Sequence, residues 1–228
     1  MRLHRFYTPA ELQLESFVVI EEKMLLHQWM RVFRLRTGNE IILFNGDGND
    51  YISTIETLSE KRAVVVPTKK TPSPKLKKDT WLFVSLIKKD KLEWVVEKGT
   101  ELGIKHFVPI ISERSEKKLF NMERLQKIAV EASEQCGRGD IPLIHELVAI
   151  EKATTIGPKE KICFDFSGTP LKNTANTGQL GLFIGPEGGF TPKELEFFKK
   201  NKIQISSLGI LTMRAETAAI AASALVNL

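Results

Sequence analysis

The sequence predicts an α/β protein of two parts, in which a small β-barrel precedes a larger domain built on a parallel sheet. Residues 1–70 contain short strand-like runs, whereas after residue 80 strand-like runs alternate with helical patterns. Between them, Lys69–Asp79 is rich in lysine and proline and has almost no apolar side chains. Its prolines disfavour a helix or a central strand. We therefore expect domains at 1–70 and 80–228, joined by a linker at 71–79.

One helix and four strands are expected in the first domain. Between Glu21 and Leu35 the apolar residues recur at helical spacing, and Gly38 follows as a stop signal. The segment Asn45–Asp50 contains Asn-Gly and Asp-Gly steps between two apolar runs, which is typical of a hairpin. The expected strands are Phe17–Ile20, Ile41–Phe44, Tyr51–Ile55 and Ala63–Val66. Short strands in this arrangement favour a small barrel.

The second domain is expected to contain a parallel sheet. Trp81–Ile87 is a continuous apolar run, as in a strand that is buried on both faces. Helices are expected from Leu92 to Gly103 and from Met122 to Gln135. The further expected strands are Phe107–Ile111, Ile162–Phe166, Leu180–Ile184 and Ile203–Gly209.

Composition narrows the class of protein. The formal net charge of +5 permits a polyanionic partner without requiring one. The N-terminus has no apolar core after its basic residues, and no run approaches the roughly 18 apolar residues that span a bilayer, so we expect a cytoplasmic protein without a membrane contact. Cys136 and Cys163 lack the spacing of a zinc site, and the four histidines are scattered, so no metal is expected.

The segment Ile184–Phe190 leaves one expected strand and enters a helix. Its three glycines and one proline allow bare backbone to approach a ligand closely. Thr191 and Glu194 have the spacing of a capping box, which marks the start of the helix. The glycine spacing is neither that of a dinucleotide fingerprint nor that of a phosphate loop. On spacing alone, a ligand loop and a tight connection without a ligand remain equal alternatives.

A second glycine-containing loop follows the strand that ends at Gly209. The residues Ile210–Glu216 lead into an alanine-rich helix at Thr217–Leu225. Small side chains on nearly every face of this helix permit close packing, either in the core or at a subunit interface.

At these two loops the chain resembles the SPOUT superfamily of RNA methyltransferases, and within it the RsmE family, which methylates N3 of a uridine in 16S ribosomal RNA. The resemblance covers essentially the whole chain. Its blocks, in order, are Arg2–Tyr7, Glu97–Gly103, Ser112–Ser115, Glu131–Arg138, Ile184–Phe190 and Leu208–Ala218. One departure is Leu211, which replaces an arginine of the family pattern, while Arg214, Glu216 and Thr217 remain in register.

The resemblance implies a deep trefoil knot in the C-terminal domain, a PUA-like N-terminal barrel that binds RNA, and a homodimer. It also implies S-adenosylmethionine (SAM) as the cofactor and 16S ribosomal RNA, within the small ribosomal subunit, as the substrate. Leu182 and Met213 would form apolar walls of the cofactor pocket. The implied cofactor-binding residues are Leu182, Ile184, Gly185, Pro186, Glu187, Gly188, Gly189, Leu208, Gly209, Leu211, Met213, Thr217 and Ala218.

Two residues are candidates for the chemistry. Arg214 either stabilises charge that develops on the uracil oxygens or anchors a phosphate or carboxylate. Glu216 either removes the N3 proton, or pairs with Arg214, or serves as a carboxylate at the start of a helix. Glu187 has similar standing to Glu216, so the base is left unassigned.

The RNA-binding candidates are arginines and one glutamine of the family blocks, because arginine forks suit phosphate. They are Arg2, Arg5, Arg114, Gln135 and Arg138. The linker lysines are interpreted as a solvated segment. Two alternative functions stay open: a non-catalytic RNA-binding or ribosome-assembly factor, for which Leu211 is the only support, and a SPOUT enzyme that acts on another RNA.

Overall fold

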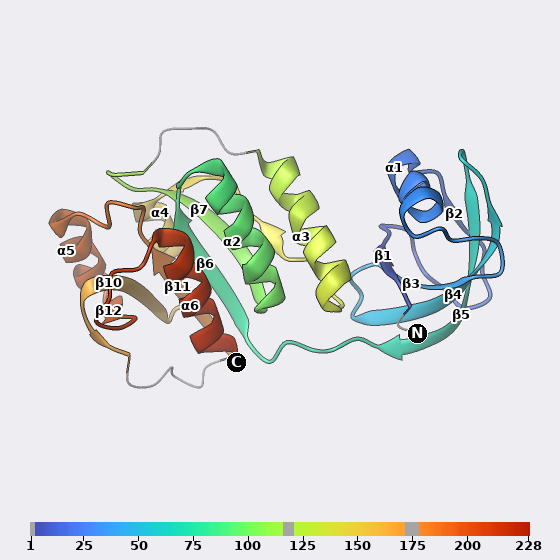
Figure 1. The fold of residues 1–228 in the computed structure, drawn as a ribbon. Coiled ribbons are helices and arrows are strands. Elements are labelled where there is room, and N and C mark those ends of the chain that lie inside the picture. Colours follow the sequence, from blue (N-terminus) through green and yellow to red (C-terminus); the bar gives the residue numbers. More distant parts are fainter. Residues whose placement is uncertain (1–2, 116–120, 172–177) are drawn as a thin grey trace. The chain divides into compact units, whose positions relative to one another are not determined.

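The computed structural model describes residues 3–115, 121–171 and 178–228 (Figure 1). Its tertiary contacts divide the chain into two compact units. These are Met1–Lys75 with Ser133–Ile141, and Leu76–Ala132 with Pro142–Leu228. The first unit therefore includes a segment, Ser133–Ile141, that the expected boundaries of 1–70 and 80–228 placed with the second domain.

The first unit is built on a five-stranded sheet with the order β1-β3-β4-β5-β2. Its strands are β1 (Arg5–Tyr7), β2 (Val18–Ile20), β3 (Glu40–Phe44), β4 (Asn49–Leu58) and β5 (Ala63–Pro72). The pair β1–β3 is parallel, and the other pairs are antiparallel. Because β1 and β2 are the two edges of this sheet and do not pair with each other, the small barrel that we expected is a half-barrel.

A short helical segment covers the apolar side of this sheet. It consists of α1 (Lys23–His27) and the π-helical turn η1 (Gln28–Val32), so it is shorter than the helix expected at Glu21–Leu35. The wide turn places Trp29 in the core, where it is fully buried against Phe6 at a ring-centroid distance of 5.2 Å. Phe6 is therefore a core residue of the first unit.

Strand β5 runs through part of the segment that was expected to be irregular. It continues to Pro72 and pairs with β4 up to Asn49. Its last four residues, Lys69–Pro72, lie in the segment where the sequence disfavours a central strand. They form an edge instead, because β2 pairs only with Ala63–Val65, and beyond that point β5 has a free edge, where proline is tolerated.

Arg5 ties the first unit together. Its guanidinium forms an ion pair with Asp50 at 2.6 Å, and the two side chains are only 5% and 16% exposed. It also donates to the backbone oxygens of Ser133 at 3.0 Å and Arg138 at 3.2 Å. These bonds join residues that are more than a hundred positions apart, which explains why Ser133–Ile141 belongs to the first unit.

The second unit is built on a parallel sheet of seven strands, with the order β12-β10-β11-β6-β7-β8 and with β9 also paired to β7. Its strands are β6 (Asp79–Ser85), β7 (Ile104–Ile111), β8 (Leu143–Ile144), β9 (Val148–Ala149), β10 (Lys161–Pro170), β11 (Gln179–Ile184) and β12 (Gln204–Ser207). The parallel sheet expected from the sequence is confirmed.

Helices cover both faces of this sheet, as Figure 1 shows. The helices are α2 (Lys89–Glu101), α3 (Met122–Cys136), α4 (Ile150–Thr155), α5 (Pro192–Lys200) and α6 (Ala215–Asn227). On one face α2, α3 and α6 pack on alternate strand residues such as Leu82 and Leu182. On the other face α4 and α5 pack on the intervening residues, such as Phe83 and Phe183. Within the described ranges, no helix has the length and apolar character needed to cross a membrane.

Replacement of Arg5 by alanine should destabilise the first unit by about 3 kcal/mol, because Asp50 would stay largely buried without its ionic partner. Hydrogen exchange of the β4 amides would measure the loss of stability. The control is Arg31→Ala, which breaks an exposed pair with Glu60 at 3.2 Å and should cost less than about 1 kcal/mol. Equal losses in the two variants would contradict a structural role for Arg5.

Candidate functional site

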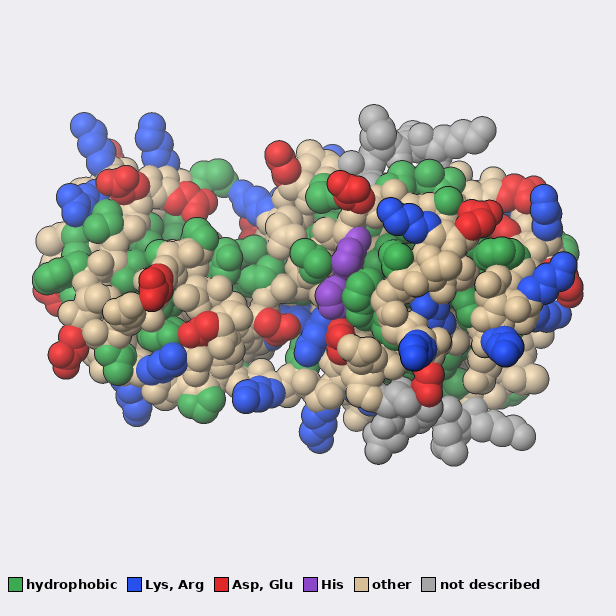
Figure 2. Space-filling view, turned by 180° about the vertical axis from the view of Figure 1, so that it is seen from behind, with side chains coloured by type: hydrophobic (Ala, Val, Ile, Leu, Met, Phe, Trp, Pro, Cys, Tyr) green, Lys and Arg blue, Asp and Glu red, His purple; other side chains and the backbone are tan. Residues whose placement is uncertain are grey.

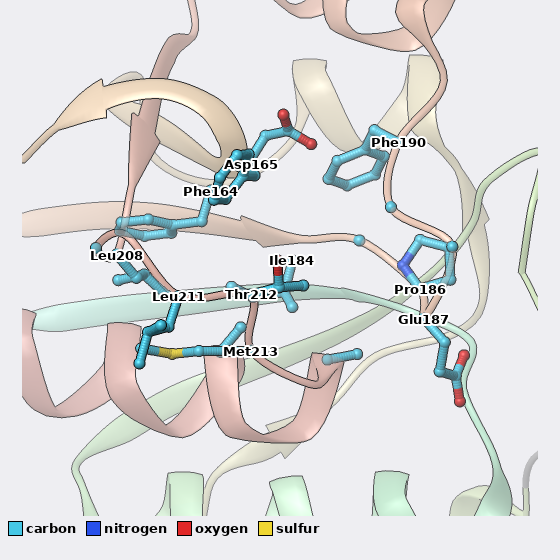
Figure 3. Close-up of a pocket in the computed structure, with 17 residues that line it drawn as sticks. Phe164, Asp165, Ile184, Pro186, Glu187, Phe190, Leu208, Leu211, Thr212 and Met213 are labelled. Carbon is cyan, nitrogen blue, oxygen red and sulfur yellow. The ribbon is translucent and has the colours of Figure 1, made fainter.

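The site is a cavity of about 330 Å³ in the second unit, at the carboxyl ends of the parallel strands (Figure 3). The bulge within β10 and the loops that follow β11 and β12 form it. Its residues are Phe164, Asp165, Phe166, Ile184, Gly185, Pro186, Glu187, Gly188, Gly189, Phe190, Leu208, Gly209, Leu211, Thr212, Met213, Ala215 and Ala218. Ligands of open α/β sheets bind at this edge of the sheet.

The loop after β11 brings bare backbone to the wall of the cavity. Gly189 has φ of 67° and donates its N–H to the oxygen of Pro186 at 2.8 Å, which closes a tight turn. A left-handed φ of this kind favours glycine. A Cβ atom on Gly185 would lie 3.2 Å from the backbone nitrogen of Phe190. Backbone groups of this loop are thus exposed to whatever occupies the cavity.

A capping box fixes the end of this loop, as the sequence predicted. The Thr191 side chain accepts from the backbone N–H of Glu194, and the Glu194 carboxylate accepts from the backbone N–H of Thr191 at 2.7 Å. The same carboxylate also accepts from the backbone N–H of Glu113 at 2.8 Å. Glu194 therefore joins the start of α5 to the loop that follows β7.

Strand β10 is irregular where it meets the cavity. Its register against β12 shifts between Phe164 and Thr169. Asp165 lies inside this bulge and accepts from the backbone N–H of Ser167 at 2.9 Å and from its hydroxyl at 2.6 Å. Bulges commonly redirect a side chain next to a site. Here the bulge leaves Asp165 in the wall of the cavity.

The carboxylate of Asp165 also affects the buried thiol beside it. Burial first, and then the negative charges of Asp165 and Glu194, raise the pKa of Cys163 well above its usual value. Cys163 is therefore a neutral core residue on the other face of the sheet and takes no part in the chemistry of the site.

The loop after β12 forms the remaining wall and is unusually exposed. Ile210 is 91% exposed and Leu211 is 76% exposed, while Gly209 has φ of 136°. In Figure 3 Leu211 and Met213 lie beside each other on this loop. The wall is thus apolar at the position where the family pattern has an arginine.

Eleven of the thirteen predicted cofactor residues line the cavity, and two do not. Leu182 is fully buried in the core cluster beneath it, because its strand position faces α2 and α6. Thr217 points to a neighbouring depression beside Trp94. Six further residues line the cavity that the sequence did not indicate, namely Phe164, Asp165, Phe166, Phe190, Thr212 and Ala215. Asp165 directly follows the buried residues of β10, but the bulge that directs it to the cavity has no motif in the sequence.

A wide groove of about 880 Å³ lies beside the cavity and shares Glu187 and Gly188 with it. Its residues are Lys88, Lys91, Arg114, Ser115, Glu187, Gly188, Arg214 and Glu216. Both predicted catalytic residues, Arg214 and Glu216, line this groove rather than the cavity. Arg214 is exposed, whereas Glu216 is buried at 6% exposure, with its carboxylate 3.9 Å from Nζ of Lys91.

The RNA-binding candidates differ in burial and in their partners. Arg2 lies outside the described residues. Arg5 and Arg138 have buried guanidinium groups that pair with Asp50 and Asp140, and this burial argues against a contact with phosphate. Gln135 is exposed on the end of α3. Arg114 is exposed in the groove and donates to the backbone oxygen of Gly188 at 2.7 Å, which places it on the glycine loop.

The sequence suggested that the four histidines are scattered, but two of them lie together in the structure. His106 and His145 lie 3.0 Å apart between ring nitrogens, and His106 stacks on Trp81 at 4.0 Å. Figure 2 shows histidine side chains next to each other on one face. Burial lowers the pKa of His145. Within the part of the chain that is described, no group of His, Cys, Asp and Glu side chains is arranged to hold a metal ion.

Comparisons with known proteins agree with this geometry. Residues 74–227 match the model of the RNA methyltransferase domain, and residues 30–68 match that of the RNA methyltransferase PUA domain. The chain is 30% identical to the ribosomal RNA small subunit methyltransferase E of Rickettsia conorii, over 100% of this chain and 96% of the relative. It is 27% identical to the Bacillus subtilis protein of the same name, over 89% and 86% of the two chains.

A solved structure of a related methyltransferase has the same fold. The ribosomal RNA small subunit methyltransferase E of Neisseria gonorrhoeae, bound to SAM, superposes with a TM-score of 0.90 at 26% identity, over 98% of this chain and 96% of that one. The chain therefore belongs to the family of ribosomal RNA small subunit methyltransferases E.

Proposed function

We propose that this protein transfers a methyl group from SAM to N3 of a uridine in 16S ribosomal RNA. The observation that carries the proposal is the cavity at the carboxyl edge of the sheet, in a fold that a SAM-bound relative shares over 98% of this chain. RNA methylation follows from the family, whose members carry it in their name. The choice of uridine N3 rests on the ordered sequence blocks.

The cavity fits SAM in size and in chemistry. Its volume of about 330 Å³ lies in the range of small-molecule sites. Ile184, Pro186 and Met213 offer apolar walls for an adenine ring, and the glycine loop offers backbone groups. Asp165 supplies a negative charge that suits a cationic cofactor with ribose hydroxyls. We assign the holding of the cofactor to these residues.

When bound, SAM supplies a methyl group on a positively charged sulfur, and orientation of the acceptor provides much of the rate. Arg214 borders the cavity from the groove and is the candidate to stabilise negative charge on the uracil oxygens. Glu216 is held near Lys91, which supports an anchoring role in preference to that of the base. The proton on N3 must still be removed, and that base is left unassigned.

Three finer features belong to the same proposal. A trefoil knot is supported by the path of the chain, which pairs β12 with β10 at the sheet edge and then returns to pack α6 on β6 and β11. A homodimer is supported by exposed apolar side chains, namely Ile210, Leu211, Leu225 and Leu228. Action in the cytoplasm on the assembled small subunit belongs to the same proposal, and the names of the relatives support small-subunit ribosomal RNA as the substrate.

Incubation of the purified protein with labelled SAM and small subunits that lack the modification should transfer the label to 16S ribosomal RNA. Mass spectrometry of the digested RNA should place the methyl on N3 of a single uridine. Cofactor binding without any transfer would favour a non-catalytic factor. Transfer to a different RNA would instead show that the substrate is assigned wrongly.

The glycine turn should be required for cofactor binding. Gly189→Ala should weaken SAM binding about tenfold, because a left-handed φ of 67° disfavours any side chain and the turn must shift. Isothermal titration calorimetry would measure the change. Gly178→Ala is the matched control, since a Cβ atom there meets nothing within 4 Å, and it should bind SAM normally. Unchanged binding by Gly189→Ala would contradict the assignment of this loop.

A further inference from the structure

The groove beside the cofactor cavity has an excess of positive charge. Lys88, Lys91, Arg114 and Arg214 line it, opposed only by Glu187 and Glu216. Lys91 is already balanced by Asp90 at 3.6 Å and by Glu216 at 3.9 Å. In the described part of the chain, Lys88 and Arg214 have no ion-pair partner. The charges of Lys88 and Arg214 are therefore available to bind an anionic ligand.

Two helices begin at this groove and add to its positive potential. Lys88 is the N-cap residue of α2, and Arg214 is the N-cap residue of α6. Each helix has 13 residues, so each carries a partial positive charge at its first turn. Neither N-cap side chain caps its own helix, and both side chains are exposed. The groove is thus suited to an anion.

The position of the groove relative to the cavity indicates which anion. Glu187 and Gly188 line both spaces, so a group in the groove lies across the glycine loop from the cofactor. Arg114 donates to the oxygen of Gly188, and a Cβ atom on Gly188 would lie 3.2 Å from Cδ of Arg114. A nucleotide whose base reaches the methyl group must keep its phosphates nearby, outside the apolar cavity.

The geometry points to a phosphate subsite in this groove, in which Lys88 contacts a backbone phosphate of the RNA strand next to the target nucleotide. Arg114 and Arg214 would flank the RNA strand, and the ion pair of Lys91 and Glu216 lines the groove between them. This inference rests on the proposed function and adds to it a residue, Lys88, that binds substrate without touching the cofactor. Phosphate contacts of this kind position a strand without reading its sequence.

The chain offers a matched control at the next position. Lys89 carries the same charge on the same helix, but it does not line the groove and pairs with Glu93 at 3.9 Å. The experiment compares Lys88→Ala, Lys88→Arg and Lys89→Ala. For each variant, methyl transfer to unmodified small subunits gives KM and kcat, the salt dependence of subunit binding gives the number of phosphate contacts, and calorimetry gives the affinity for SAM.

Lys88→Ala should raise KM for the subunit about tenfold, leave kcat and SAM affinity within about twofold, and lower the salt slope of binding by about one. Lys88→Arg should restore most of the affinity, and Lys89→Ala should match the parent protein. The inference is overturned if Lys88→Ala and Lys89→Ala behave alike, or if Lys88→Ala weakens SAM binding instead. Absence of transfer by the parent protein would contradict the proposed function itself, a separate result.

Discussion

The parallel direction of the strands in the second unit is the constraint on which the site depends. Because β6, β10, β11 and β12 all run the same way, the bulge within β10 and the loops that follow β11 and β12 meet at one edge of the sheet. Each of these three segments contributes something different: Asp165 in the bulge, a glycine turn, and an exposed apolar segment around Leu211. The helices on both faces bury the strands and so hold these loop ends in place.

The glycine loop then separates two environments with different chemistry. On one side the walls are apolar side chains and bare backbone, with Asp165 as a charge beside Glu187. On the other side the surface is cationic and open, and Glu216 is held there by Lys91. Glycine is favoured at the left-handed turn of Gly189, and at Gly188 it leaves room for the side chain of Arg114. A single short segment thus lines both the cavity and the groove.

Local sequence signals predicted much of this architecture. Continuous apolar runs marked β6 and β11, and the spacing of Thr191 and Glu194 marked the start of α5. Features that depend on distant partners were not predictable in this way. Arg5 resembled an RNA ligand, but its partner Asp50 is 45 residues away and its acceptor Ser133 is 128 residues away. Asp165 was missed because a bulge, rather than a motif, directs it to the cavity.

The exposed loop at Ile210 and Leu211 shows how a departure from a family pattern acts in three dimensions. Leu211 lines the cavity with an apolar side chain where an arginine would bring charge, while Arg214 keeps its place in the groove. A crystal structure with SAM bound tests the central claim most directly. We predict the cofactor between Ile184–Gly189 and Leu208–Met213, with its methyl group facing the groove of Lys88 and Arg214. A cofactor bound elsewhere, or a methyl group that faces away from this groove, would contradict the account.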